Sequence, residues 1–294
     1  RSKPEAARGI LEDLRCLGID WDEGPDVGGP FAPYVQSERS ARYAEALRAL
    51  FEARRIYPCS CTRKEVRQAA SAPHGNPVGA YRYPGSCRPS SEEAWRQLAT
   101  SPAAADYTRV TPYSDRRRLP AMRFAAGDEP VRFVDEFAGP QRTDLAAEIG
   151  DFVVRRSDGV AAYHLAVAVD DAEQQISHVV RGDDLLGTTA CQIEIARALG
   201  HTPPRYAHVP LVVDREGRRL AKRKGDLTLK ALRAAGVRPE AVAGYLAWTC
   251  GLIERPEPAS PRDLVPAFAL TRVETTPAVI DESVVSTLLE MSKL

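Results

Sequence analysis

Apolar and polar positions alternate with helical spacing at the start of the chain and with strand spacing further along it. Apolar residues recur every three to four positions over 6–17 and 39–50, which predicts two helices. Ser37 stands where a side chain could cap the second helix. Residues 131–135 and 151–155 alternate between apolar and polar, so they predict two half-buried strands.

The second half of the chain predicts a return to alternating strands and helices. A strand from about 166, a turn at Arg181, a helix at 189–199 and a strand at 208–213 follow one another. This order is expected of a parallel sheet whose ligands bind at the carboxyl ends of its strands. A last apolar helical face, around 242–252, predicts a helical C-terminal part.

Composition narrows the class of protein. The 294 residues include 40 basic and 40 acidic side chains, so the formal net charge is zero and any contact with nucleic acid must be local. This length predicts about two domains. No run of eighteen apolar residues occurs, and a membrane-spanning helix is therefore not expected.

The most concentrated chemistry lies in the ten residues 215–224, which contain six lysines and arginines. They follow an apolar run at 209–213 and precede a helical pattern, so they form a connection between a strand and a helix. Gly217 and Gly225 supply backbone freedom there. From composition alone, the segment is either a phosphate-binding loop or a solvated basic turn.

The residues Arg-Leu-Ala-Lys-Arg at 219–223 resemble the second signature, Lys-Met-Ser-Lys-Ser, of class I aminoacyl-tRNA synthetases in its glutamyl form. The resemblance implies that Lys222 is the catalytic cation and binds ATP phosphates together with Arg219 and Arg223. Arg219 replaces the first lysine of the pattern, and Ala221 replaces its serine.

A second resemblance covers 162–186, which is similar to the glutamate-pocket region of glutamyl-tRNA synthetases and their short relatives. It implies that Arg181 binds the γ-carboxylate of glutamate, that Tyr163 orients it and that Leu185 closes the apolar side. Without the family, a surface ion pair of Arg181 with Asp183 or Asp184 would be the favoured interpretation.

The six cysteines have no evenly spaced framework, which indicates a reducing, cytoplasmic location. Cys59 and Cys61 form a Cys-x-Cys pair that could share a tetrahedral zinc ion. Resemblance to the short zinc-containing relatives adds Tyr83 and Cys87 as the remaining ligands. Phenolate is an uncommon zinc ligand, so His74 stays a rival for the fourth position.

The family also carries a first signature, His-x-Gly-His, at the start of a helix where ATP phosphates bind. None of the five histidines has that spacing, and the opening residues are similar to a segment that follows the first signature in the family. We therefore expect about forty to fifty upstream residues, which would hold the first strand and helix of the nucleotide fold.

Taken together, the motifs identify the chain as similar to the glutamyl-Q-tRNA(Asp) synthetases, because too little follows Lys222 for a large anticodon-binding region. The fold implied is α/β, with a Rossmann-type parallel sheet, an inserted zinc-containing acceptor-binding-like region and a short helical C-terminal part. The boundaries expected for the two halves of the nucleotide fold, the insertion and the C-terminal part are 1–56, 57–165, 166–213 and 214–294.

The resemblance implies activation of L-glutamate with ATP and Mg²⁺, and transfer of the glutamyl group to queuosine in tRNA(Asp). We expect a monomer with no membrane partner. Candidates to meet the tRNA backbone are Arg116, Arg117, Arg118, Arg215, Arg218 and Lys224. The alternatives are a catalytically dead fragment, a zinc-stabilised module that binds glutamate or RNA, and a truncated glutamyl-tRNA synthetase that charges tRNA(Glu).

Overall fold

The computed structural model of the chain describes residues 4–62, 64–66, 82–111, 119–219, 227–281 and 283–294. Contacts divide the chain into two compact units. The larger unit contains residues 23–181 and 185–207, and the smaller contains 1–22, 182–184 and 208–294. The domain boundaries predicted from the sequence stay a prediction.

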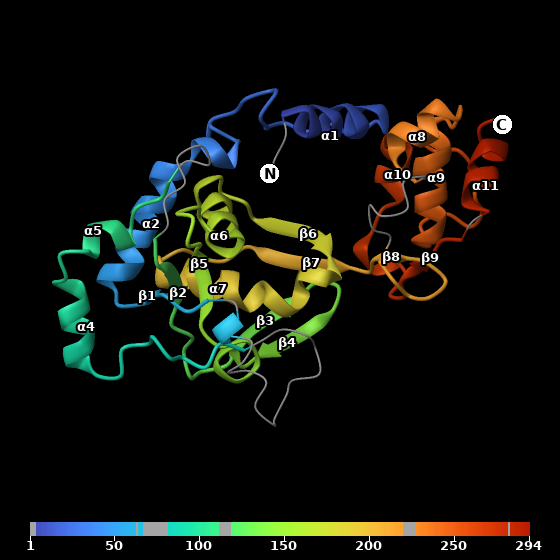
Figure 1. The fold of residues 1–294 in the computed structure, drawn as a ribbon. Coiled ribbons are helices and arrows are strands. Elements are labelled where there is room, and N and C mark those ends of the chain that lie inside the picture. The colour runs from blue at the N-terminus through green and yellow to red at the C-terminus, as the bar shows by residue number, and fades with distance from the viewer. Residues whose placement is uncertain (1–3, 63, 67–81, 112–118, 220–226, 282) are drawn as a thin grey trace. The chain divides into compact units, whose positions relative to one another are not determined.

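The helices and strands follow one another in the order shown in Figure 1. The α-helices are α1 (Pro4–Cys16), α2 (Ser40–Glu52), α4 (Glu92–Ala99), α5 (Ala104–Tyr107), α6 (Tyr163–Glu173), α7 (Thr189–Ala198), α8 (Leu229–Ala234), α9 (Pro239–Thr249), α10 (Pro261–Leu264) and α11 (Val284–Met291). The short helical turns are η1 (Gln36–Glu38), η2 (Leu145–Ile149), η3 (Asp183–Thr188), η4 (Val265–Ala267) and η5 (Leu270–Arg272). The strands are β1 (Ile56–Cys59), β2 (Ala121–Phe124), β3 (Val131–Asp135), β4 (Gly139–Thr143), β5 (Phe152–Arg155), β6 (His178–Gly182), β7 (Arg205–Val209), β8 (Val212–Val213) and β9 (Ala278–Val279).

Two sheets organise the larger unit. One is antiparallel, with the strand order β1-β2-β5. The other has the order β4-β3-β7-β6, in which β3 pairs with β4 antiparallel and with β7 parallel. This second sheet is therefore mixed, whereas the sequence predicted a parallel one. The antiparallel partner is the hairpin neighbour of β3, reached through a short turn, and a turn of that length cannot join parallel strands.

The core of the larger unit lies between these strands and the helices α2, α6 and α7. Leu47 and Leu50 of α2, Ile56 of β1 and Leu165 of α6 are all fully buried. The predicted helical spacing of α2 is confirmed by this burial, because its buried residues recur every three to four positions: Tyr43, Ala46, Leu47, Leu50 and Phe51.

The smaller unit has its own core, formed by α8, α9, α11 and the strand β9 with its flanking residues. Its buried side chains include Leu232, Tyr245, Val284 and Leu288. The helix expected around 242–252 is α9, but Trp248 on it is 38% exposed, so its apolar pattern is only partly a core pattern.

Three local predictions were wrong. Ser37 does not cap α2, because the helix begins after Arg39 and Ser37 lies within the turn η1. The segment expected as a strand from 166 is the helix α6, and Arg181 lies in the strand β6 rather than in a turn. A short apolar run fits a buried helix as well as a buried strand, and periodicity alone does not separate them.

The predicted strand at 208–213 is also divided. β7 ends at Val209 and β8 begins at Val212, with Pro210 between them. Proline has no N–H to donate to a strand ladder, which accounts for the break. None of the helices formed by the described residues is long and apolar enough to cross a membrane.

Arg39 is a buried charge of the larger unit, with a side chain that is fully inaccessible. Its Nε donates to Asp170 Oδ1 at 2.6 Å, and its Nη2 donates to Glu173 Oε2 at 2.5 Å. Its Nη1 donates to the carbonyl oxygens of Phe31 and Pro33 at 3.2 and 2.7 Å. One guanidinium thus ties the loop before α2 to the C-terminal end of α6.

The Asp170 carboxylate has further donors. Tyr43 donates its hydroxyl to it at 2.9 Å, and Gln36 Nε2 donates at 2.9 Å. Burial, followed by the charge and hydrogen bond of Asp170, raises the pKa of Tyr43 well above its usual range. The buried carboxylate is therefore fully hydrogen-bonded, as a charge in the interior must be.

We expect Arg39→Gln to lower the free energy of unfolding by about 3–5 kcal/mol, because it leaves two carboxylates without their buried cation. Urea unfolding followed by circular dichroism measures the change. Arg42→Gln is the matched control: Arg42 also pairs with Glu173, at 2.8 Å, but its side chain is 41% exposed. The control should cost no more than about 1 kcal/mol. Equal losses in the two variants would contradict the special role of Arg39.

Candidate functional site

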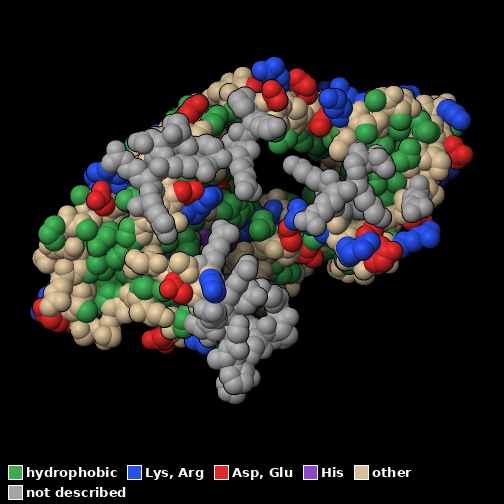
Figure 2. Space-filling view, in the orientation of Figure 1, with side chains coloured by type: hydrophobic (Ala, Val, Ile, Leu, Met, Phe, Trp, Pro, Cys, Tyr) green, Lys and Arg blue, Asp and Glu red, His purple; other side chains and the backbone are tan. Residues whose placement is uncertain are grey.

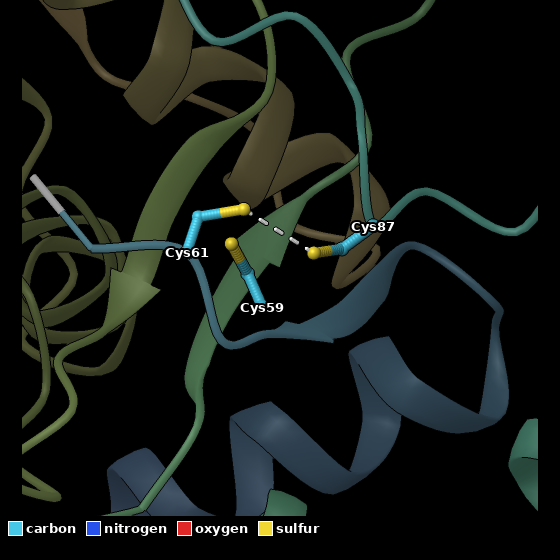
Figure 3. A group of neighbouring side chains, drawn as sticks. All are labelled: Cys59, Cys61 and Cys87. Atoms are coloured by element: carbon cyan, nitrogen blue, oxygen red, sulfur yellow. Dashed lines mark hydrogen bonds between the residues drawn. The ribbon is translucent and has the colours of Figure 1, made fainter. Parts of the chain in front are cut away.

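Three of the predicted zinc ligands lie together. Cys59 is the last residue of β1, Cys61 follows two positions later, and Cys87 comes from the loop before α4. Their Sγ atoms all lie within 4.8 Å of one another. Figure 3 shows the three thiols pointing toward a common centre. These cysteines could hold a metal ion such as zinc.

Tyr83 lies in the same cluster. Its hydroxyl oxygen is 3.4 Å from Cys59 Sγ and 3.7 Å from Cys61 Sγ, and the Sγ atoms of Cys61 and Cys87 are 3.5 Å apart. Zinc–sulfur bonds of about 2.3 Å place tetrahedral ligand atoms about 3.8 Å apart. The cluster therefore has nearly the spacing that a tetrahedral zinc ion requires.

The surroundings shift the pKa values of Cys59, Cys61 and Tyr83 in different directions. Burial opposes ionisation of Cys59, but its hydrogen-bond contacts with Tyr83 and Arg123 lower its pKa. Burial raises the pKa of Cys61 to about 11. Burial and the hydrogen bond with Cys59 raise the pKa of Tyr83. Cys59 is therefore better prepared to ionise than Cys61, and a bound cation would favour ionisation of both thiols and of Tyr83.

The backbone under this cluster is tightly packed. Gly150 has φ +74° and bridges to Tyr83, and a Cβ at this position would lie 2.8 Å from the Tyr83 carbonyl oxygen. The next residue, Asp151, is buried and accepts hydrogen bonds from Tyr57, Arg88 and the Ala126 backbone. A glycine and a buried carboxylate thus support the segment that presents Tyr83.

Figure 3 draws the side chains of the three cysteines. His74, the rival for the fourth zinc-ligand position, lies outside the described residues. Cys191 is 1% exposed and lies in the core of the larger unit. Cys16 and Cys250 are only half-buried.

The predicted glutamate-binding residues form a second cluster. Arg181 donates from Nη2 to Thr189 Oγ1 at 2.9 Å, and Thr189 donates its hydroxyl to the Leu185 carbonyl at 3.0 Å. The guanidinium of Arg181 also lies over the ring of Tyr206, 5.4 Å from its centroid. Arg181 and Leu185 are thus linked through one buried threonine.

Tyr163 opens α6 and is 48% exposed. Its ring meets the ring of His164 edge-on, with centroids 5.5 Å apart. Burial, followed by the charge of Arg181, lowers the pKa of His164. Tyr163 and Arg181 therefore share His164 as a neighbour, and the imidazole is kept neutral beside the guanidinium.

Asp171 adds a negative group on the same side of α6. Burial raises its pKa to about 6, although the positive charge of Arg181 acts in the opposite direction. The carboxylate of a glutamate ligand would meet the same guanidinium. When Asp171 is ionised, its negative charge therefore partly offsets the positive charge that Arg181 offers to the ligand.

The predicted phosphate-binding segment is described only up to Arg219. Arg219 pairs with Asp184 and forms an isolated bridge with Val213. Lys222 and Arg223 lie outside the described residues. The same holds for Arg116–Arg118 and Lys224, which were predicted to meet a tRNA backbone.

Comparison with known proteins decides the family. The model of class I tRNA synthetases (E and Q), catalytic domain, matches residues 1–255. The chain is 46% identical over 293 residues to a glutamyl-Q tRNA(Asp) synthetase from Symbiobacterium thermophilum, covering 98% of this chain and 84% of that relative. The chain belongs to the glutamyl-Q tRNA(Asp) synthetase family.

A second relative agrees with this assignment, and a solved structure has a similar fold. A glutamyl-Q tRNA(Asp) synthetase from Nitratidesulfovibrio vulgaris is 44% identical over 289 residues, with 98% of this chain and 84% of that relative covered. The crystal structure of glutamate-tRNA synthetase from Elizabethkingia anophelis superposes with a TM-score of 0.75 at 26% identity. The match covers 97% of this chain and spans 60% of that longer chain. The class I synthetase catalytic fold predicted from the sequence is confirmed.

Sequence reasoning missed several residues of this glutamyl-Q synthetase family member. Thr189, His164 and Asp171 surround Arg181, and Arg123 lies with its guanidinium 3.7 Å from the centroid of the Tyr83 ring. Asp171 lies within 162–186, the stretch that suggested the glutamate pocket. The two consecutive acids at 170 and 171, inside an otherwise apolar run, were the signal that could have identified it. Arg123 had no signal, because its partner lies far away in the sequence.

The raised pKa of Asp171 predicts an unusual pH dependence of stability. In the unfolded chain this carboxyl ionises near pH 4, whereas in the folded protein it holds its proton up to about pH 6. The folded state binds more protons in this interval, so stability falls as the pH rises through it. We expect Asp171→Asn to be more stable than the parent at pH 8, by at most about 3 kcal/mol, and equal to it near pH 4.

Urea unfolding at the two pH values measures the effect. Asp20→Asn is the control, because the Asp20 side chain is 92% exposed and its removal should change little at either pH. A variant of Asp171 that is less stable at pH 8 would show that attraction to Arg181 outweighs the cost of burial.

Proposed function

We propose that this protein activates L-glutamate with ATP and transfers the glutamyl group to queuosine in tRNA(Asp). The observation that carries the proposal is the environment of Arg181 in a chain of this family. The guanidinium of Arg181 donates to Thr189 and lies over the Tyr206 ring, and its planar shape suits bidentate binding of a carboxylate.

The reaction has two steps. The α-carboxylate of glutamate attacks the α-phosphate of ATP, and pyrophosphate leaves as glutamyl-adenylate forms. A hydroxyl of the queuosine ring then attacks the activated carbonyl, and AMP leaves as the ester forms. Neither step requires a nucleophilic side chain, so catalysis rests on positioning and on cations near the phosphates.

In this proposal Arg181 binds the γ-carboxylate, and Tyr163 orients the amino acid while Leu185 closes the apolar side. Lys222 neutralises the departing pyrophosphate, with Arg219 and Arg223 beside it and Mg²⁺ bound to ATP. His164 supports Arg181, because a neutral imidazole avoids repulsion between two neighbouring cations.

Zinc has a structural place in the proposal. Cys59, Cys61 and Cys87 would provide three sulfur ligands, and Tyr83 would provide the fourth, with His74 as the alternative. The tetrahedral spacing of the four described atoms supports Tyr83. A zinc ion there would fix the segment 57–165, which we propose as an acceptor-binding-like region.

Contact with tRNA would be local, and the protein would act as a monomer. Outside the grey residues, Figure 2 shows acidic and basic side chains interspersed on this face rather than gathered into one basic patch. Arg215 and Arg218, two predicted backbone contacts, are each paired with a carboxylate in the free protein. Phosphates would have to displace those carboxylates.

Glutamate-dependent exchange of pyrophosphate into ATP, measured without tRNA, tests the activation step. The assay uses this chain and a form extended upstream to the nearest in-frame methionine. We expect exchange with glutamate in the extended form, and Arg181→Lys should raise the KM for glutamate at least about tenfold because it loses bidentate geometry. Transfer of labelled glutamate to tRNA(Asp), and not to tRNA(Glu), tests the second step.

Absence of exchange in both forms would contradict the enzyme proposal and favour a glutamate- or RNA-binding module. Transfer to tRNA(Glu) would favour a glutamyl-tRNA synthetase.

The ligand set of the zinc site is tested by metal content. We expect about one zinc per chain by mass spectrometry, and loss of that zinc in Cys61→Ser. Tyr83→Phe keeps the ring but removes the ligand oxygen, so it should weaken zinc affinity measured by competition with a chromophoric chelator. His74→Ala is the matched control and should bind as the parent does. The opposite result for these two variants would assign the fourth position to His74.

A further inference from the structure

The hairpin that leads into the signature segment carries three arginines, and each has a carboxylate partner. Arg215 pairs with Asp281 at 2.6 Å. Arg218 pairs with Asp214 at 2.9 Å, and that aspartate also accepts from the Arg218 backbone at 2.9 Å. Arg219 pairs with Asp184, which lies thirty-five residues earlier.

The third pair differs from the other two in what it connects. The turn at 214–218 is closed by its own backbone bonds, Gly217 N to Asp214 O and Asp214 N to Arg218 O, both 2.9 Å. The Arg218 pair therefore stays within one turn. The Arg219 pair instead joins the first residue of the signature segment to a residue of a different turn, Asp184 of η3.

The backbone beside Asp184 is shaped for this close approach. A Cβ on Gly182 would lie 2.8 Å from Leu211 Cδ2 and 2.9 Å from Asp184 Oδ1. A larger residue at 182 would have to push aside the side-chain ends of Leu211, at the start of the hairpin, and of Asp184. Gly182 thus allows Asp184 to reach the segment that carries Arg219.

Without the family resemblance, the sequence favoured an ion pair of Arg181 with Asp183 or Asp184. In the structure Asp184 pairs with Arg219, and Arg181 donates to Thr189 and lies over Tyr206. Asp184 therefore binds Arg219, the residue that replaces the first lysine of the family's signature. A guanidinium can bind a carboxylate and still offer other N–H groups to a phosphate, which an ammonium does less well.

We propose that Asp184 is a positioning residue that anchors the start of the signature segment through Arg219. The proposal rests on the proposed function, in which residues 219–223 meet the phosphates of ATP. Asp184 holds the Arg219 side chain in place before ATP binds, so this side chain loses less freedom when the nucleotide arrives. It acts on ATP through Arg219 and has no direct role in binding glutamate.

Limited trypsin digestion tests the anchor without any substrate. An exposed ion pair shifts an equilibrium by no more than about fivefold, so Asp184→Asn should speed cleavage after Arg218 and Arg219 by about three- to fivefold. Mass spectrometry of the products identifies these two sites. Asp183→Asn is the matched control, because it removes the same charge one residue away and should cleave as the parent does. Equal cleavage rates in the two variants would overturn the anchor.

Kinetics of pyrophosphate exchange in the extended form test its role. We expect Asp184→Asn to raise the KM for ATP about three- to fivefold and to leave the KM for glutamate unchanged. In an Arg219→Gln background the same change should have no further effect, because the partner is already absent. A merely structural role would move both KM values together with the melting temperature.

A rise in the KM for glutamate equal to that for ATP would overturn the proposal and assign Asp184 to the glutamate pocket. Additive effects of Asp184→Asn and Arg219→Gln would also overturn it. If no form shows exchange, the proposed function fails, and the trypsin comparison still decides whether Asp184 holds Arg219.

Discussion

The buried guanidinium of Arg39 is the interaction on which the rest of the larger unit depends. A charge with no access to water requires partners on every side, and Arg39 finds them in Asp170, Glu173 and two backbone carbonyls. These partners come from the loop before α2 and from α6, so satisfying one side chain brings two distant segments together. The helix held in this way is the one that begins at Tyr163.

The chemistry of the candidate site follows from that placement. α6 presents Tyr163 and His164 at one end and Asp171 near the other, and the electrostatic effect of Arg181 reaches both His164 and Asp171. Burial keeps the imidazole of His164 neutral, so no second cation lies beside Arg181, and the Asp171 carboxylate partly offsets the positive charge that Arg181 offers to a ligand. A reaction without a protein nucleophile relies on such placement, because its rate depends on where charges lie when the phosphate reacts.

Motif spacing allowed much of the site to be predicted. The Cys-x-Cys pair with Tyr83 and Cys87 converges in space, since a metal site requires its ligands at one point however the chain runs between them. The helices α1, α2 and α7 were predicted from periodicity within one or two residues of their ends. The prediction of a strand at α6 was wrong because its run of alanine and valine suits either structure, and only packing against α7 and α2 decides between them.

The sequence by itself determined the family, the candidate ligands of zinc and glutamate, and most of the helices. These depend on local spacing and on residue types that chemistry restricts. Only the tertiary structure decided that Asp184 pairs with Arg219 rather than Arg181, that Arg39 is buried between Asp170 and Glu173, and that Arg123 covers Tyr83. A charge does not select its partner by distance along the chain. It pairs with whichever opposite charge the fold brings near, and burial determines how strongly the two then interact.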